Sequence, residues 1–483
     1  METKSNKSIQ GSMIWSFGAE ILVKLISPVT NMALARILAP DAFGVVAVCN
    51  MIVSFVDIIS DAGFSKYMVQ CDFADDGEKG RYANTAFWSH LGLSVFLWAI
   101  VFLLRNPIAS LMGESDYATA ISVACSQLVF TSMSSIQMGL LRREFAFKKL
   151  FIARASVALT PLIVTIPIAI ATHSFWALIV GNIAGAMINA IVLFCISQWK
   201  PGWFYSFTLL KKMFSFSFWS LCEALAHWMI FWIDTFIVGM WYDDYYLGLY
   251  KNSSNMIMSI INMSTAAIGP VLFASLSRIK NNAVAFYDTF LHISKLVSYI
   301  LFPAGIGLFV FRKPITLLLL GEQWTESADI IGSWALMLVV SVTFYSFPAE
   351  AYKAKGIPKI LFFFQLSYLV FLIPVCLVAA RTDFWLFVYC RCLCVLEQVV
   401  VSFIFAKKFL DWNVLTFLKN MIRPISASAV MAGMCILVYR DNVSIWISLL
   451  SIVAIVFLYF GVLFLFFRKD IKESLALIRR KDY

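Results

Sequence analysis

Two stripes of ionisable and amide side chains interrupt otherwise apolar stretches of this chain. Each stripe has members at offsets of 0, 4 and 11 residues, and the stripes lie 203 positions apart. At about 100° per helical residue, the members of one stripe fall within roughly 40° of one another, on a single helical face. The members are Glu20, Lys24 and Asn31 in the first stripe, and Glu223, His227 and Asp234 in the second. Ionisable groups at membrane depth usually line a bundle interior or a water-filled cavity, so a repeated stripe indicates a duplicated transporter bundle.

The first stripe suits an anionic ligand. Lys24 lies 14 residues after Gln10, about 21 Å into a helix. Pro28, four residues on, removes the hydrogen bond to the Lys24 carbonyl and bends the helix there. Lys24 is therefore a candidate anchor for a diphosphate. The alternative is that Glu20 and Lys24 only neutralise each other at i, i+4.

The second stripe suits protons or cations. Glu223, His227 and Asp234 combine carboxylates with an imidazole, which titrates near physiological pH. Such sets within a membrane often act as proton relays. The alternative is a structural hydrogen bond between His227 and Glu223.

Further buried charges are candidates for the cavity wall. Asp61, Lys251 and Lys295 each stand within an apolar stretch, where exposure to lipid would be costly. We expect these three residues to contribute to a cavity for a diphosphate and its sugars. No cofactor or metal is expected, because the ten cysteines lie scattered through apolar segments without the spacing of a metal site.

The elements that position these residues are membrane-spanning helices. Of the 483 residues, 61% are hydrophobic and 14% are charged, whereas a soluble protein carries about 25% charged residues. Apolar runs of about 20 residues, each able to cross roughly 30 Å of hydrocarbon, recur from end to end. Fourteen spans are predicted, at 11–37, 42–68, 83–104, 117–141, 151–172, 175–197, 213–239, 247–273, 287–311, 328–350, 360–380, 384–406, 420–439 and 443–467.

The distribution of positive charge predicts the orientation. Of the 38 Lys and Arg residues, 26 fall in segments on the side of the N-terminus and six on the opposite side. Since positive loops stay in the cytoplasm, both termini are expected there. An odd error in the number of spans would scramble this alternation, so twelve is the alternative to fourteen.

The duplication extends beyond the stripes. Gly44 and Gly248, 204 residues apart, each follow a short acidic or turn-forming loop and begin a further helix. The predicted fold is an all-α polytopic membrane protein with two six-helix lobes related by an internal repeat, plus two C-terminal helices. The predicted divisions are 1–198 for the first lobe, 199–408 for the second, and 409–483 for the last two helices and a cytoplasmic tail.

Six ordered segments carry a family resemblance: "LARILAPDAFGVVAV", "DAGFSKYMVQ", "TAFWSHLGL", "LLRREFAFKKL", "SFWALIVG" and "WIDTFIVGMWYDDYYLGLYKNS". They resemble polysaccharide exporters of the multidrug/oligosaccharidyl-lipid/polysaccharide (MOP) superfamily, in the branch that includes the colanic acid exporter. The resemblance covers roughly residues 10–260 by motif and the remainder by topology.

This resemblance implies a flippase in the bacterial inner membrane. Such proteins move undecaprenyl-pyrophosphate-linked oligosaccharides from the cytoplasmic to the periplasmic leaflet by alternating access, and H⁺ or Na⁺ coupling and contact with polysaccharide polymerase machinery would fit that role. The alternatives are a cation-coupled exporter of small drugs in the same superfamily, which would favour acids over Lys24, and a membrane-bound polysaccharide polymerase or ligase. A membrane enzyme is disfavoured because no gap between spans is long enough for a catalytic domain. The sugar, the coupling ion, the resting state and the oligomeric state are not encoded in any motif.

Overall fold

The computed structural model describes residues 25–111, 117–357, 359–440, 444–468 and 470, and all regular secondary structure in these ranges is helical. The chain divides into two compact units, Met1–Lys251 and Asn252–Tyr483. A helical segment over 25–37 opens the described part of the first unit. It is followed by α2 (Pro40–Asp61), α3 (Phe64–Gln70), α4 (Asp76–Leu103), α5 (Arg105–Leu111), α6 (Tyr117–Ala124), α7 (Gln127–Arg143), α8 (Phe147–Thr160), the π-helical turn η1 (Pro161–Thr165), α9 (Ile166–Thr172), α10 (Trp176–Ile196), α11 (Phe207–Trp241) and the start of α12 (Asp244–Arg278).

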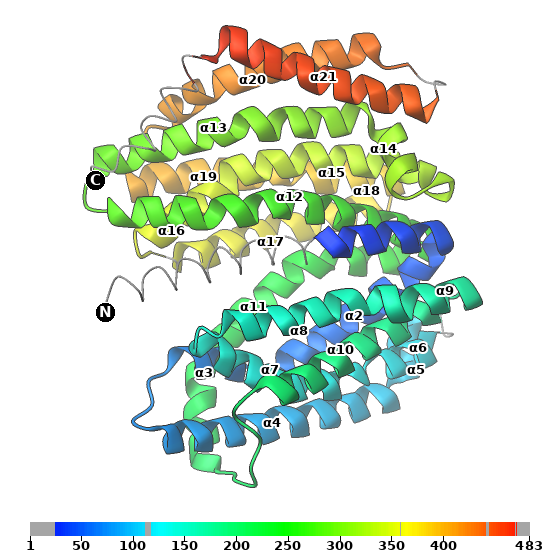
Figure 1. Ribbon diagram of the computed structural model, residues 1–483, viewed down its shortest axis with the longest axis vertical. Coiled ribbons are helices and arrows are strands. Elements are labelled where there is room, and N and C mark those ends of the chain that lie inside the picture. The colour runs from blue at the N-terminus through cyan, green and yellow to red at the C-terminus, as the bar shows by residue number, and fades with distance from the viewer. Residues whose placement is uncertain (1–24, 112–116, 358, 441–443, 469, 471–483) are drawn as a thin grey trace. The chain divides into compact units, whose positions relative to one another are not determined.

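Long helices of the first unit lie side by side. Helix α10 packs along α7 and α8, α4 packs along α7, and α11 packs along α2, α3 and α4 (Figure 1). The predicted boundary at 198/199 does not coincide with the limit of this unit, because α11 packs with the helices that precede it. The division into two lobes and a final helix pair stays a prediction.

The second unit contains the remainder of α12 and a further set of helices. These are α13 (Ala283–Val310), α14 (Arg312–Leu319), the 3-10 turn η2 (Glu322–Ser327), α15 (Ala328–Ser341), the π-helical turn η3 (Val342–Ser346), α16 (Phe347–Ala354), α17 (Lys359–Ala380), α18 (Phe384–Leu393), α19 (Val395–Leu410), α20 (Val414–Val438) and α21 (Ile445–Phe466). Helix α13 packs against α15 and α20, and α21 packs against α20 (Figure 1).

The polytopic all-α class is confirmed. Twelve helices in the described part of the chain are long and apolar enough to cross a membrane, and they coincide with twelve of the fourteen predicted spans. Of the other two, the span 247–273 lies within α12, which has 35 residues, and the span 11–37 falls mostly outside the described residues. The count of fourteen stays a prediction.

A two-residue non-helical turn separates α2 from α3 and fixes the position of Asp61. Asp61 is the last residue of α2, and Ala62 and Gly63 then adopt left-handed conformations with φ of 44° and 79°. Gly63 tolerates this φ without strain, and a Cβ there would lie only 2.8 Å from Ser217 Cβ on α11. The sequence "DAG" therefore ends α2 and leaves the Asp61 carboxylate at its C-terminal end.

The repeat is visible as a reciprocal contact between α2 and α12. A Cβ at Gly44 would overlap the carbonyl oxygen of Asp244, and a Cβ at Gly248 would overlap the carbonyl oxygen of Pro40. Each pair of equivalent residues differs by 204 positions, and all four residues lie in the first unit. The equal spacing of the two contacts supports the duplication inferred from sequence.

Candidate functional site

The first stripe lies largely outside the described residues. Glu20 and Lys24 are not among them, whereas Asn31 lies half-buried in the helical segment 25–37 and has an interaction partner. The proposed diphosphate anchor at Lys24 therefore stays a prediction.

The second stripe divides into two environments along α11. Glu223 and His227 are exposed within the first unit, and Glu223 lies 3.5 Å from Lys66 Nζ of α3. Asp234 is only 4% exposed. The three residues therefore share a helical face but not a common environment, and their role in ion coupling stays a prediction.

Asp234 is held by hydrogen bonds at the start of α12. Its Oδ2 accepts a hydrogen bond from Tyr250 OH at 2.8 Å, and its Oδ1 accepts one from the Thr235 backbone N–H at 2.7 Å. Because a buried carboxylate is costly without donors, both bonds stabilise Asp234, and the Tyr250 bond fastens α11 to the first turns of α12.

Lys251 is buried beside the same contact. Its Nζ donates to the Phe231 carbonyl oxygen at 3.0 Å and lies 4.1 Å and 4.2 Å from the ring centroids of Phe231 and Trp232. Aromatic faces stabilise a desolvated cation. The structure thus brings Lys251 and Asp234 to one end of α11.

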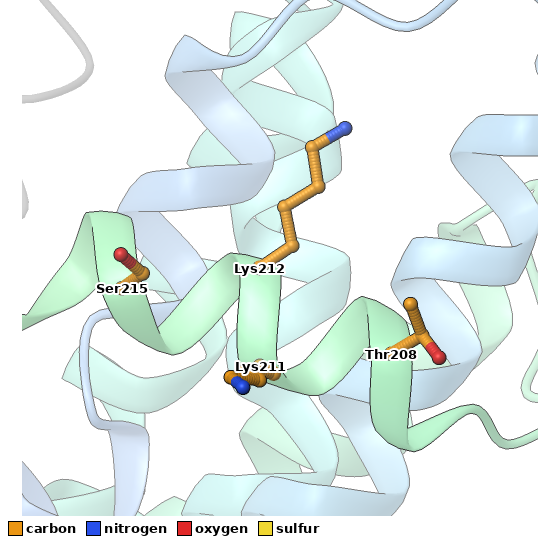
Figure 2. Close-up of a pocket in the computed structure, with 4 residues that line it drawn as sticks. All are labelled: Thr208, Lys211, Lys212 and Ser215. Carbon is orange, nitrogen blue, oxygen red and sulfur yellow. The ribbon is translucent and has the colours of Figure 1, made fainter.

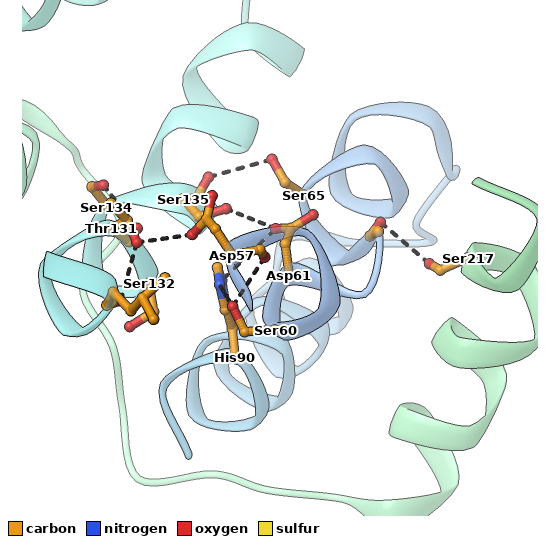
Figure 3. Close-up of polar contacts among 12 residues, drawn as sticks. Asp57, Ser60, Asp61, Ser65, His90, Thr131, Ser132, Ser134, Ser135 and Ser217 are labelled. Atoms are coloured by element: carbon orange, nitrogen blue, oxygen red, sulfur yellow. Dashed lines mark hydrogen bonds and ion pairs between the residues drawn. The ribbon is translucent and has the colours of Figure 1, made fainter. Parts of the chain in front are cut away.

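Asp61 belongs to a polar cluster between α2, α4 and α7 (Figure 3). Ser135 Oγ donates to Asp61 Oδ1 at 2.9 Å, and one turn away Thr131 Oγ1 donates to Asp57 Oδ1, also at 2.9 Å. Both bonds join residues 74 positions apart, so they link the parallel helices α2 and α7 at two levels that are one helical turn apart. His90 of α4 completes the cluster, with its Nδ1 3.8 Å from Asp61 Oδ1.

Lys295 belongs to a second cluster, in the second unit. Asp470 Oδ1 accepts hydrogen bonds from Lys295 Nζ and, at 2.6 Å, from Arg423 Nη1, while Asp470 Oδ2 accepts one from Tyr299 OH at 2.7 Å. Burial raises the pKa of the Asp470 carboxyl, but the Lys295 and Tyr299 hydrogen bonds and the nearby cations outweigh it, so this pKa lies below its ordinary value. Lys295 is therefore neutralised by a residue just beyond α21.

A basic hollow opens on the first turns of α11. Thr208, Lys211, Lys212 and Ser215 line a volume of about 560 Å³ (Figure 2). Their spacing places them along one side of the helix, and ammonium and hydroxyl groups are donors that suit phosphate oxygens. Charge distribution predicts that this end of α11 faces the cytoplasm.

Several of these partners were not singled out as site residues from the sequence. Thr131, Ser135, Tyr299, Arg423 and Asp470 contact predicted site residues but carry no motif of their own. The i, i+4 spacing of Thr131 and Ser135, which matches that of Asp57 and Asp61, is a sequence signal that could have indicated these two hydrogen bonds. Among the described residues, no group of three His, Cys, Asp or Glu side chains could hold a metal ion.

The helix arrangement is shared with solved transporters. The lipid II flippase MurJ, in an inward closed conformation, matches 95% of this chain and 100% of its own with a TM-score of 0.76 and 14% sequence identity. A multidrug resistance MATE family transporter of the MOP superfamily, in an inward-facing conformation, matches 80% of this chain and 94% of its own, with a TM-score of 0.63 and 10% identity. The protein thus has the fold of MOP-superfamily transporters.

Sequence comparison then identifies the family. Residues 33–329 match the family described as polysaccharide biosynthesis protein, and the chain belongs to that family. This confirms the resemblance predicted from the six segments.

Three curated relatives are similar over a large part of the chain. The succinoglycan biosynthesis transport protein ExoT of Rhizobium meliloti (strain 1021) is 22% identical over 69% of this chain and 67% of its own length. The lipopolysaccharide biosynthesis protein WzxC of Escherichia coli (strain K12) is 23% identical over 67% of this chain and 65% of its own length. A membrane protein in the cps region of Klebsiella pneumoniae is 25% identical over 64% of each chain. Each match therefore spans about two thirds of the relative's length.

Proposed function

We propose that this protein is a flippase that moves undecaprenyl-pyrophosphate-linked oligosaccharide units from the cytoplasmic to the periplasmic leaflet for surface polysaccharide assembly. It works in the bacterial inner membrane with both termini in the cytoplasm, by alternating access coupled to a cation gradient. The observation that carries the proposal is the family match over residues 33–329. The relatives named for transport in succinoglycan biosynthesis and for lipopolysaccharide biosynthesis support the substrate class.

The chemistry of such a substrate explains the charged residues within the spans. A diphosphate cannot cross hydrocarbon unaided, so its path needs cations, hydrogen-bond donors and water. The proposed binding set is Glu20, Lys24, Asn31, Asp61, Lys251 and Lys295. In this set, Lys251 donates to the Phe231 carbonyl oxygen and Lys295 donates to Asp470. Each lysine must therefore break that hydrogen bond before it can bind the diphosphate.

The basic hollow on α11 is suited to the first step of transport, the attraction of the anionic carrier lipid to the cytoplasmic side of the protein. Lys211 and Lys212 stand with two hydroxyl side chains at the predicted cytoplasmic end of the helix. Positive charge at that surface attracts anionic lipid headgroups. The positive charge of Lys211 and Lys212 therefore concentrates the carrier lipid on the cytoplasmic side, where transport starts.

Transport by the purified protein tests the proposal. Proteoliposomes are prepared with the full chain and a fluorescent polyprenyl-diphosphate oligosaccharide. A quencher added outside suppresses the fluorescence of lipid in the outer leaflet, and the fraction of lipid that it reaches is followed in time. We expect Lys24→Ala to slow translocation at least tenfold while Lys407→Ala, at the end of α19, transports at the wild-type rate. Equal rates in the two variants would remove Lys24 from the mechanism, and absence of translocation by the wild type would overturn the proposed function.

The fold likeness to a MATE transporter keeps a drug exporter as the second candidate. The two functions differ in their cargo: a cation exporter lowers the susceptibility of cells to cationic drugs, whereas a lipid flippase does not. Drug resistance in expressing cells that is lost on Asp61→Asn, with no effect on lipid-linked sugar, would favour this second function.

A further inference from the structure

The hydrogen bonds of Ser60 define the protonation of His90. Ser60 Oγ lies 3.0 Å from the Asp57 carbonyl oxygen and 3.3 Å from His90 Nε2. A hydroxyl has a single hydrogen, and the carbonyl oxygen can only accept it. Ser60 Oγ–H therefore donates to the backbone carbonyl oxygen of Asp57, and Ser60 Oγ accepts a hydrogen bond from His90 Nε2–H.

This tautomer leaves His90 Nδ1 as a bare acceptor that faces another acceptor. Nδ1 has no hydrogen-bond partner, and His90 is only 1% exposed. The nearest charged atom is Asp61 Oδ1, at 3.8 Å, which accepts a hydrogen bond from Ser135 (Figure 3). Two acceptors thus face each other with no hydrogen between them, and one added proton would satisfy both.

Two carboxylates, and no paired cation among the described residues, stand around these acceptors. The ionisable groups that act on His90 are Asp57 and Asp61 of α2. Helix α7 offers the hydroxyls of Thr131 and Ser135 to these carboxylates.

The remaining charges stand further away on neighbouring helices. Arg142 of α7 acts on Asp61 at longer range and is itself repelled by Arg154 of α8. Lys66 of α3 is paired with Glu223 of α11, where His227 lies one turn on. Helix α6, also packed on α2, has no charged residue. Among the described residues, no Lys or Arg forms an ion pair with Asp57 or Asp61.

Resting on the proposed flippase function, we propose that Asp61 and His90 together bind one proton at membrane depth, and that this proton is the coupling ion. The side chain of Asp61 is 25% exposed, so a proton can reach it, whereas His90 is enclosed. The proton adds to Nδ1, and the resulting N–H donates to Asp61 Oδ1. Intramembrane carboxylate–histidine pairs are suited to this role because imidazole gains and loses a proton at physiological pH.

Proton binding also acts on the helices that hold the pair. Asp61 ends α2, so its carboxylate lies against the negative end of the helix dipole. The added proton removes this repulsion and converts the contact between α4 and α2 from two opposed acceptors into a hydrogen bond. Uptake and release of the proton therefore change how α4 packs against α2.

The chain contains four histidines, so ¹⁵N-histidine NMR on the full-length protein in detergent can follow His90, assigned from His90→Gln. As the pH is lowered through the acid range, we expect wild-type His90 to change from the Nε2–H tautomer to the doubly protonated ring. In Asp61→Asn the amide N–H donates to Nδ1, and His90 keeps the Nε2–H tautomer over the same range. Asp57→Asn, one turn away, is the matched control in which the change persists.

Gradient-driven transport gives the second measurement. We expect an imposed pH gradient to accelerate wild-type translocation and Asp61→Asn to lose that acceleration, while its thermal unfolding stays close to that of the wild type. A wild-type His90 that keeps one proton throughout would overturn the site, and so would an Asp61→Asn variant that titrates as the wild type does. Transport driven by a Na⁺ gradient alone would overturn the coupling by protons. If His90 titrates as expected but no lipid is translocated, the proton site stands and the proposed function fails.

Discussion

Three acidic side chains in this protein each accept a hydrogen bond from a hydroxyl group. Tyr250 donates to Asp234, Ser135 to Asp61, and Tyr299 to Asp470. A hydroxyl compensates part of the cost of burying a carboxylate without fixing its charge, which a Lys or Arg partner would do. Asp470 has both kinds of partner and is expected to stay ionised, whereas Asp61 forms no ion pair with a Lys or Arg among the described residues.

The Tyr250–Asp234 bond gives a stability prediction. Tyr250→Phe removes the donor but leaves the buried carboxylate, so we expect the free energy of unfolding to fall by about 1–3 kcal/mol. Tyr352 is the matched control, because its buried hydroxyl has no hydrogen-bond partner, and Tyr352→Phe is expected to be neutral or slightly stabilising. Thermal unfolding of both variants in detergent measures the difference, and equal stabilities would contradict this account.

The Asp470 cluster predicts a specific pH dependence. Its pKa is lowered in the folded protein, so the ionised carboxylate stabilises the fold above the unfolded-state pKa of about 3.9. That contribution is lost as the pH falls through the folded-state pKa. At neutral pH we expect Asp470→Asn to destabilise the protein by about 1–3 kcal/mol.

Acid titration of stability completes that test. As the pH falls below about 3.9, the difference between the wild type and Asp470→Asn is expected to shrink, and it vanishes below the lowered folded-state pKa, where both proteins lack the charge. The control is Asp72→Asn, whose side chain is fully exposed and whose effect is expected to be small throughout. A constant difference between wild type and Asp470→Asn down to strongly acidic pH would refute a role for the charge.

At the scale of the elements, the crossing of α2 and α12 depends on the absence of side chains at Gly44 and Gly248. The helices approach there through backbone atoms of Pro40 and Asp244. A backbone carbonyl cannot rotate away from an added methyl group as a flexible side chain can. The two helices must therefore separate if either glycine is substituted.

We expect Gly44→Ala and Gly248→Ala each to destabilise the protein by about 1–3 kcal/mol through overpacking. Gly92, inside α4, has open space where a Cβ would lie, so Gly92→Ala is the control. It is expected to stabilise α4 by up to about 1 kcal/mol. Unfolding temperatures that fall for Gly92→Ala as much as for the other two variants would show that the contact is unimportant.

At the scale of the whole molecule, charge asymmetry predicts the orientation of every helix. Phe145, between α7 and α8, lies in the basic segment expected in the cytoplasm, and His173, between α9 and α10, lies on the opposite side. Both are exposed loop residues in left-handed conformations, with φ of 51° and 47°. They are therefore a matched pair for labelling.

In a Cys195→Ser background, which removes the one exposed cysteine among the described residues, we expect His173→Cys to react with a membrane-impermeant maleimide added outside spheroplasts. Phe145→Cys is expected to react only after the membrane is permeabilised. The reverse pattern would invert the proposed orientation and would place the basic hollow of α11 on the periplasmic side.

The sequence by itself determined the class of protein, the positions of twelve spans and the family. These properties are local: about 20 consecutive apolar residues specify a span whatever lies beside it, and short ordered motifs identify relatives. The equivalence of Gly44 and Gly248 was also visible in the sequence, because duplication preserves spacing along the chain, but their contact was not.

Only the tertiary structure decided which polar groups meet. Lys295 and Asp470 are 175 residues apart, and Asp61 and Ser135 are 74 residues apart, so no local pattern pairs them. The face shared by Glu223, His227 and Asp234 was correct as helical geometry, yet α12 covers Asp234 and leaves the other two exposed. Periodicity defines the direction of a side chain on its own helix, whereas its environment depends on which neighbouring helix packs at that level.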